Sequence, residues 1–109
     1  MPTTYKVLGQ SAPSATTLTT LYTVPSATQA VVSSIVVANL AASTATFRIA
    51  VRPAGASIAT SQYVGYDITV GASDSTVLTL GITMGATDVL SVYSSTATVT
   101  FSAFGSEIS

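Results

Sequence analysis

The chain has 109 residues, of which 6% are charged and 48% hydrophobic, and its formal net charge at pH 7 is −1. It contains no Cys, His or Trp, which excludes disulfides, thiolate zinc sites, cysteine nucleophiles and the commonest general base of enzymes. Its basic residues are Lys6, Arg48 and Arg52, too few for the clustered phosphate contacts that bind nucleic acid or for anchoring on an acidic membrane surface.

The length predicts a single domain over residues 1–109, with its own hydrophobic core and with residues 1–16 as a candidate extended N-terminal arm. The first residues lack the charged and apolar regions of a secretory signal. The most apolar stretch, residues 30–42, is too short for a membrane-spanning helix and is interrupted by polar residues. We therefore expect a protein made in a cytoplasm without an export signal of its own.

Alternating apolar and polar residues predict β-strands along most of the chain, because successive side chains of a strand point to opposite faces. In chain order, the predicted strands cover residues 4–8, 17–24, 31–37, 45–52, 62–70, 76–82, 89–93 and 97–103. The side chains expected on buried faces include Ala45, Phe47, Ile49, Val51, Leu78, Leu80, Ile82, Ala97, Val99, Phe101 and Ala103. No window has the spacing of an amphipathic helix.

The strand over residues 31–37 is apolar on both faces. Regular alternation places Val31, Ile35 and Val37 together on one of them. A strand with two apolar faces is either central in a sheet or has its outer face covered by another subunit. Val31, Ile35 and Val37 are therefore candidate residues of a subunit interface.

About eight short strands, separated by turns rich in Pro, Gly, Ser and Asp, predict an all-β, single-domain antiparallel β-sandwich. A jelly roll, an immunoglobulin-like sandwich and a small barrel all produce this pattern. The sequence leaves the choice among these strand orders open.

The acidic residues do not form a recognisable catalytic or metal-binding motif. Asp74 and Asp88 lie in turn sequences, where Asp commonly accepts a hydrogen bond from its own backbone. No calcium loop, phosphate-binding loop or nucleophile elbow is present. We therefore predict a protein that is not an enzyme, with no catalytic residue, no metal site and no cofactor.

Four other residues are candidates for contacts with a partner. Arg48 and Arg52 are four residues apart, so they project from the same face of a strand. They form either ion pairs with surface acids, which contribute little to stability, or contacts with another subunit. Tyr63 and Tyr66 are candidate ligand-contacting aromatics, because tyrosine suits interfaces and sugar stacking; the alternative is two ordinary half-buried residues.

Several segments of the sequence resemble a known group of proteins. They are residues 21–25, 30–39, 47–55 and 101–107. From about Leu18 to its C-terminus, the chain resembles small all-β virion structural proteins of tailed bacteriophages, including phages of cyanobacteria and aquatic bacteria, many of which have no assigned role. The resemblance implies a component of the virion and brings no catalytic motif. We associate Cys with the position of Ala38 in these relatives, a difference that affects packing only.

The resemblance, together with the missing catalytic motifs, implies a non-catalytic virion structural protein, present in many copies as a tail, baseplate or neck fibre component or as a capsid-decorating (cement) protein. The scarcity of charge agrees with this, because soluble monomers usually keep themselves apart by surface charge. The expected partners are further copies of the chain, other virion proteins and a host surface receptor, with no nucleic acid and no membrane. The alternative is a carbohydrate- or receptor-binding β-sandwich module.

Overall fold

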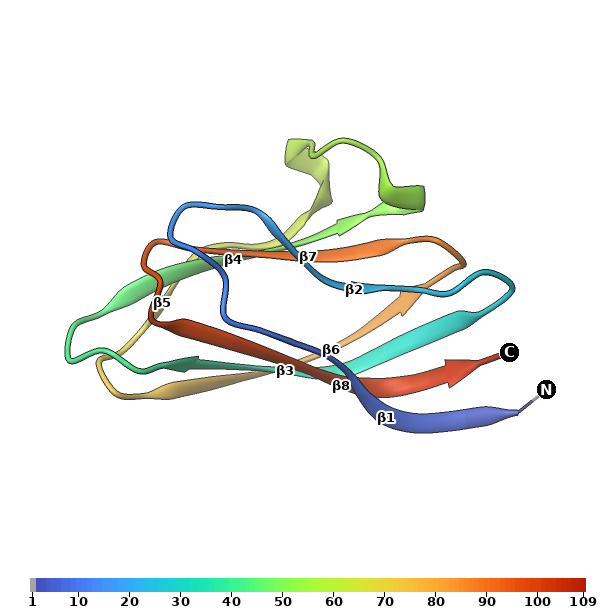
Figure 1. Ribbon diagram of the computed structural model, residues 1–109, viewed down its shortest axis with the longest axis horizontal. Helices are drawn as coiled ribbons and strands as arrows, with labels where there is room; N and C mark the ends of the chain where they lie inside the picture. Colours follow the sequence, from blue (N-terminus) through green and yellow to red (C-terminus); the bar gives the residue numbers. More distant parts are fainter. Residues whose placement is uncertain (1) are drawn as a thin grey trace.

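The computed structural model describes residues 2–109, which form eight β-strands in two four-stranded sheets packed face to face (Figure 1). The strands are β1 (Thr3–Ser11), β2 (Thr19–Thr23), β3 (Gln29–Asn39), β4 (Ala45–Arg52), β5 (Tyr63–Val70), β6 (Ser75–Met84), β7 (Val89–Ser94) and β8 (Val99–Ile108). Between β4 and β5 the chain makes two short 3-10 turns, η1 (Pro53–Gly55) and η2 (Thr60–Gln62). Residues 2–109 contain no helix with the length and apolarity needed to cross a bilayer. The predicted all-β sandwich in a single domain is confirmed.

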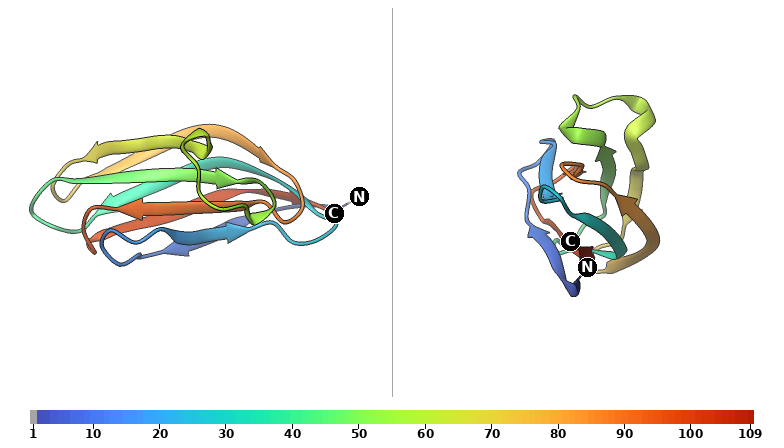
Figure 2. Two further views of the ribbon diagram at one scale, coloured as in Figure 1. Left: turned by 90° about the horizontal axis from the view of Figure 1, so that it is seen from above. Right: turned by 90° about the vertical axis from the view of Figure 1, so that its right-hand side faces the viewer.

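The strand order is that of a jelly roll. The first sheet has the order β1-β8-β3-β6 and the second the order β2-β7-β4-β5, with neighbouring strands antiparallel. The pairs β4·β5, β3·β6, β2·β7 and β1·β8 are nested inside one another along the chain, as in one long hairpin rolled into two sheets. An immunoglobulin-like sandwich would instead place β1 beside β2. In Figure 2 the start of β1 and the end of β8 lie side by side, as the pairing of Thr3 with Ile108 requires.

The N-terminal segment is not the separate arm that we expected for residues 1–16. Strand β1 pairs with β8 from Thr3 to Ser11, and Leu8 within it is buried in the core. Its backbone is therefore part of the ladder, and β1 is an edge strand of the first sheet. Met1 lies outside the described residues.

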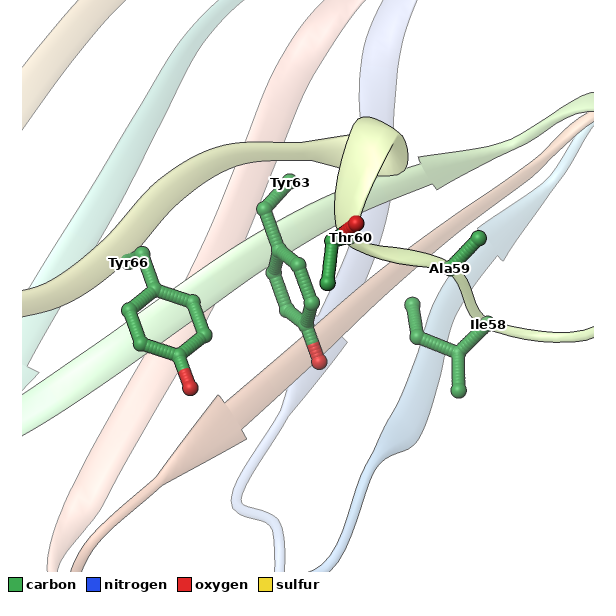
Figure 3. Close-up of a pocket in the computed structure, with 5 residues that line it drawn as sticks. All are labelled: Ile58, Ala59, Thr60, Tyr63 and Tyr66. Atoms are coloured by element: carbon green, nitrogen blue, oxygen red, sulfur yellow. The ribbon is translucent and has the colours of Figure 1, made fainter.

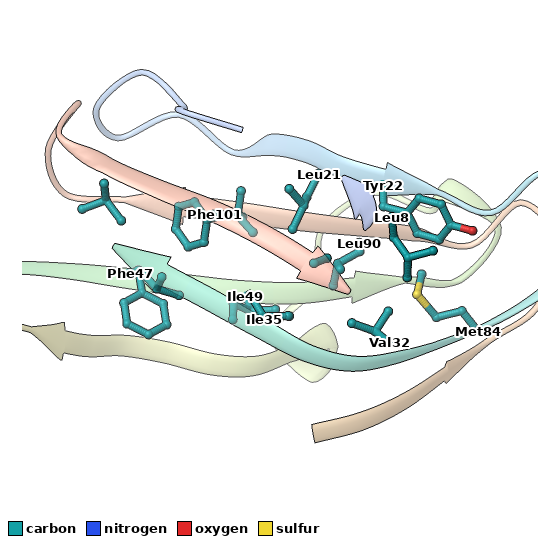
Figure 4. Close-up of a cluster of buried hydrophobic side chains, with 14 of the residues drawn as sticks. Leu8, Leu21, Tyr22, Val32, Ile35, Phe47, Ile49, Met84, Leu90 and Phe101 are labelled. Atoms are coloured by element: carbon teal, nitrogen blue, oxygen red, sulfur yellow. The ribbon is translucent and has the colours of Figure 1, made fainter. Parts of the chain in front are cut away.

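The core lies between the two sheets (Figure 4). Phe47 and Ile49 enter it from β4 of the second sheet, and Phe101 and Ile35 enter it from the first sheet, each at most 1% exposed. Burying such a side chain stabilises the fold by roughly 1.5–3 kcal/mol. The alternation predicted for residues 45–52 and for the strand ending at Ala103 is confirmed at these positions.

A β-bulge divides β3 into two halves whose side chains alternate in opposite phase. The register with both neighbouring strands shifts between Val32 and Ser34. Val32 is therefore buried before the bulge, while Ile35 and Val37 are buried after it, all at 0% exposure. The prediction that Val31, Ile35 and Val37 share an outward face is wrong. Val31 points outward, whereas Ile35 and Val37 belong to the core and have no surface to offer a subunit interface.

Strand β6 is also irregular where it pairs with the bulge of β3. Leu80 and Gly81 stand outside the register between Thr79 and Ile82. Gly81 has φ of +61°, a backbone conformation that residues with a side chain rarely adopt. Leu80 is 41% exposed, so the expectation that it faces the core is wrong. Ala97 is exposed as well, because it lies in the turn before β8.

A single buried amide fixes one end of the sandwich. Asn39 is 2% exposed and donates through Nδ2 to the carbonyl oxygens of Ser43 at 2.7 Å and Gly71 at 3.2 Å. Its Oδ1 accepts from the backbone N–H of Ala41 at 3.1 Å and from the hydroxyl of Thr98 at 3.2 Å. Every donor and acceptor of this amide is used, and three connections between strands are tied together through it.

Candidate functional site

The outer faces of the two sheets differ in charge. The strands of the first sheet contain two charged residues, Lys6 and Glu107. Glu107 accepts hydrogen bonds from Lys6 Nζ at 3.2 Å and from the hydroxyl of Tyr22 at 2.5 Å. Since Tyr22 belongs to β2 of the second sheet, both charged side chains lean toward the gap between the sheets. Within the described residues, the outward face of the first sheet therefore carries no charge.

We call this uncharged outer surface of the first sheet the neutral face. It consists of apolar side chains with serines and threonines between them. The apolar members are Tyr5, Val7, Val31, Val36, Val77 and Phe104. Tyr5, Val77 and Val7 are 83%, 61% and 47% exposed. Val36 pairs with Val77, and Val7 pairs with Phe104, so these side chains are direct cross-strand neighbours. Neighbouring exposed apolar side chains are typical of a surface that contacts another molecule.

The outward face of the second sheet carries a cluster of charged and aromatic residues. The guanidinium carbon of Arg48 is 4.1 Å from the ring centre of Tyr66 and 4.4 Å from that of Tyr93. Arg48 also donates from Nε to Asp67 Oδ1 at 2.6 Å and from Nη2 to Asp67 Oδ2 at 3.4 Å. The hydrogen bond to Asp67 raises the pKa of Arg48 above its ordinary value, although desolvation acts in the opposite direction. Arg48 is thus charge-compensated and makes cation–π contacts with two rings.

A β-bulge in β5 builds this arrangement. Arg48 of β4 faces two residues of β5, Tyr66 and Asp67, because the register between the strands shifts there. Asp67 has φ of +50°, a left-handed conformation that Asp tolerates better than most residues. The extra residue in the bulge changes the direction of the neighbouring side chains. The ring of Tyr66 and the carboxylate of Asp67 can therefore both contact the guanidinium of Arg48.

Beside Arg48, two tyrosines line an open groove of about 660 Å³ together with Ile58, Ala59 and Thr60. The rings of Tyr63 and Tyr66 meet edge to face, with 5.0 Å between centroids and 85° between planes. Figure 3 shows both hydroxyl groups pointing the same way. Residues three apart lie on opposite faces of a regular strand. The register shifts of β5 therefore bring these two tyrosines to one side.

The far wall of the groove belongs to the connection between β4 and β5, which rises above the second sheet (Figure 1). Arg52 holds the start of this connection by donating to the carbonyl oxygens of Ala56 at 2.7 Å and Gly55 at 3.1 Å. Asp88 Oδ1 accepts from the backbone N–H of Ala54 at 2.8 Å. The start of the connection is therefore fixed by side chains anchored on β4 and on the turn before β7, and Gln62 Oε1 accepts from the backbone N–H of Ala59 in the wall at 2.9 Å.

The structure gathers three of the residues singled out from the sequence, Arg48, Tyr63 and Tyr66. Arg52 projects from the same face as Arg48, as predicted, and its guanidinium donates to the backbone of the loop that follows it. Tyr93 joins them from the neighbouring strand β7. Sequence reasoning did not place Asp67 in the site, although the adjacency of a tyrosine and an acid at positions 66 and 67 was the available signal.

The turn acids take the structural role that was predicted for them. Asp74 Oδ1 accepts from the backbone N–H of Ser75 at 2.8 Å, and Asp88 Oδ2 accepts from that of Gly85 at 2.9 Å. Across residues 2–109, acidic side chains do not gather in threes where they could hold a metal ion.

Glu107 and Tyr22 join the two sheets at the edge of the core. Burial, and then the hydrogen bond to Glu107, raise the pKa of Tyr22 well above its ordinary value. The hydrogen bond from Tyr22 lowers the pKa of Glu107, with help from Lys6 and against the opposing effect of burial. This link ties β8 of the first sheet to β2 of the second.

Compared with models of known protein families and with curated protein sequences, the chain matches none of them. The candidate functional surfaces are the neutral face of the first sheet and the aromatic groove on the second.

Proposed function

We propose that the protein is a virion structural protein of a tailed bacteriophage, present in many copies as a tail, baseplate or neck fibre component or as a capsid-decorating protein. In this role the chain is not an enzyme, and it associates with further copies of itself and with other virion proteins. The observation that carries the proposal is the neutral face, which offers exposed apolar side chains without a single charge among the described residues.

Association through the neutral face would not require any charged side chain to lose its hydration. Burying a charged group is expensive unless it finds a partner, and the cores of protein interfaces are accordingly depleted in charge. The neutral face has no ion to desolvate, while Tyr5, Val7 and Val77 would each remove apolar area from water on contact. Closed symmetric contacts between identical copies would cover this face on every subunit.

The fold is compatible with such a role. Eight-stranded jelly rolls of two sheets recur in viral capsid proteins and also in lectins. Fold alone does not define function, so the fold supports the proposal only together with the neutral face.

Two exposed positions on edge strands of opposite sheets provide a matched test of self-association. Val77→Lys places a charge on the neutral face, and Thr69→Lys places the same charge on the outer face of β5. Light scattering coupled to size-exclusion chromatography should give an oligomer for the wild type and for Thr69→Lys, and a smaller species for Val77→Lys. An unchanged mass for Val77→Lys would contradict association through the neutral face.

The virion role is tested separately by immunogold electron microscopy on purified phage particles, using an antibody that recognises the native protein. Label on the particles is the expected result, and its position distinguishes head, neck and tail. Absence of label from intact and from partially disassembled particles would overturn the virion assignment.

A further inference from the structure

We propose that the groove formed by Ile58, Thr60, Tyr63 and Tyr66 is a binding site for a neutral saccharide, with Arg48 and Asp67 as its polar edge. The site lies on the second sheet, whereas the neutral face lies on the first, so this inference does not depend on the association proposed above. It assigns a ligand class to the surface on which the bulge of β5 gathers aromatic and charged side chains.

The aromatic rings supply the first requirement of a sugar site, which is a platform for the C–H face of a pyranose. Tyr66 is 57% exposed, and Ile58 across the groove is 40% exposed. The edge-to-face packing of Tyr63 against Tyr66 holds the two rings in a fixed relation. A ligand in the groove therefore meets apolar side chains from β5 and from the β4–β5 connection (Figure 3).

Hydroxyl groups and a carboxylate supply the second requirement, which is hydrogen bonding around the rim of the sugar ring. Three of the lining residues, Tyr63, Tyr66 and Thr60, carry a hydroxyl group, and each hydroxyl both donates and accepts. The carboxylate of Asp67 is 47% exposed, and its oxygens retain lone pairs beyond those used by Arg48. Such acceptors match the adjacent hydroxyl donors of a saccharide.

The charge balance favours a neutral ligand over an ionic one. None of the five lining residues is charged, and the guanidinium of Arg48 beside them is already compensated by Asp67. An anionic ligand would have to compete with the carboxylate for the same guanidinium. A volume of about 660 Å³ lies within the range typical of small-molecule sites.

The site is preorganised, which reduces the conformational entropy lost when a ligand binds. Arg48 is fixed by two rings and a carboxylate. The β4–β5 connection is held at its start by Arg52 and Asp88, and at the lining residue Ala59 by the side chain of Gln62. Neither wall has to fold when a saccharide enters.

The test uses heteronuclear NMR of the full chain, titrated with neutral oligomers of glucose, galactose, mannose and N-acetylglucosamine, and with polygalacturonate as an acidic comparator. At least one neutral oligomer should shift the backbone amides of Thr60, Tyr63 and Tyr66. Tyr66→Ala should weaken its binding by about tenfold or more. Val64→Ala, at a 50% exposed position of the same strand outside the groove, is the matched control and should bind as the wild type does.

Three results would overturn the proposal: no shift at millimolar concentrations of any neutral oligomer, shifts that fall outside the groove, or wild-type affinity in Tyr66→Ala. Preferential binding of polygalacturonate would contradict the neutral class. Repeating the titration on Val77→Lys separates the two proposals, since that variant alters the neutral face and leaves the groove untouched. Thermal unfolding of each variant checks that a loss of binding is not a loss of fold.

Discussion

The ring of Phe47 meets the ring of Phe101 edge to face, with 6.0 Å between centroids and 73° between planes. Phe47 comes from β4 of the second sheet and Phe101 from β8 of the first, and both are at most 1% exposed. Because each ring belongs to a different layer, this contact joins the two sheets directly.

Replacing either ring should therefore weaken the packing of one sheet on the other. We expect Phe47→Leu and Phe101→Leu each to lower the free energy of unfolding by about 1–3 kcal/mol. The double variant should cost less than the sum of the two, by about 0.5–1.5 kcal/mol, because the ring–ring contact is lost only once. Urea unfolding of the four proteins measures both quantities, and strict additivity would mean that the two rings do not interact.

The amide of Asn39 should be replaceable by neither an acid nor an apolar side chain. Asn39→Asp cannot donate to the carbonyl oxygens of Ser43 and Gly71, and leaves both facing a buried carboxylate. Each orphaned buried acceptor costs about 1–3 kcal/mol, so the loss in unfolding free energy should reach about 3 kcal/mol or more. Thr98→Ala removes a single donor to the same amide and should cost about 1 kcal/mol. Equal losses in the two variants would contradict this account of the network.

The link between Tyr22 and Glu107 predicts a pH dependence of stability. The pKa of Glu107 is lower in the folded protein than its ordinary value of 4.5. The stabilisation is therefore fully present above that value and is lost as the pH falls through the lower, folded-state pKa. Between pH 7 and pH 3, the wild type should lose more unfolding free energy than Glu107→Gln, in which the side chain does not titrate. Parallel pH profiles for the two proteins would show that this carboxyl does not contribute.

Gly105 is required by the close approach of β8 to the bulged part of β3. A Cβ added there would collide with the backbone carbonyl of Val31, and a backbone group cannot move aside as a flexible side chain can. Gly105→Ala should lower the unfolding free energy by about 3 kcal/mol or more, whereas Ser106→Ala, at an outward position, should change it by about 0.5 kcal/mol or less. Thermal unfolding compares the two neighbours directly, and a mild effect of Gly105→Ala would show that the strands can separate easily.

Asp67→Asn should alter the ligand preference of the groove. The substitution removes the compensating charge of Arg48 while keeping a side chain of the same shape. The groove edge should then become cationic, so polygalacturonate should gain affinity and neutral oligomers should lose it. Titration of both ligand classes against the variant and the wild type measures the change. An unchanged preference would mean that Asp67 does not set the charge of the site.

The alternation of apolar residues predicted the strands, and it placed Phe47, Ile49 and Phe101 correctly in the core. It failed at the bulge of β3, where a single irregularity reverses the phase of the strand. Residues 30–37 are apolar in both phases, so nothing in their pattern marks the reversal. The choice of a jelly roll over an immunoglobulin-like order depends on which distant strands pair, and a local period does not contain that information.

The candidate site was predictable only in part for the same reason. Arg48 was found because its strand is regular, and Tyr63 and Tyr66 were found by residue type alone. Their meeting depends on the register shifts of β5 against β4, and Tyr93 joins them only because β7 is the other neighbour of β4. A bulge is a property of two strands together, so it becomes visible only when the partner strand is known.

The nested pairing of the strands also predicts the order in which the two surfaces form as the chain folds. The pair β4·β5 joins strands that follow each other directly, while β3·β6, β2·β7 and β1·β8 enclose progressively longer segments. Because the entropy lost in closing a loop grows with its length, we expect the chain to fold from its middle outward. The hairpin that carries the groove then forms early, whereas the neutral face needs β1 and β8 and is completed last. A newly made chain would thus present no finished contact surface to its copies until its own folding was over.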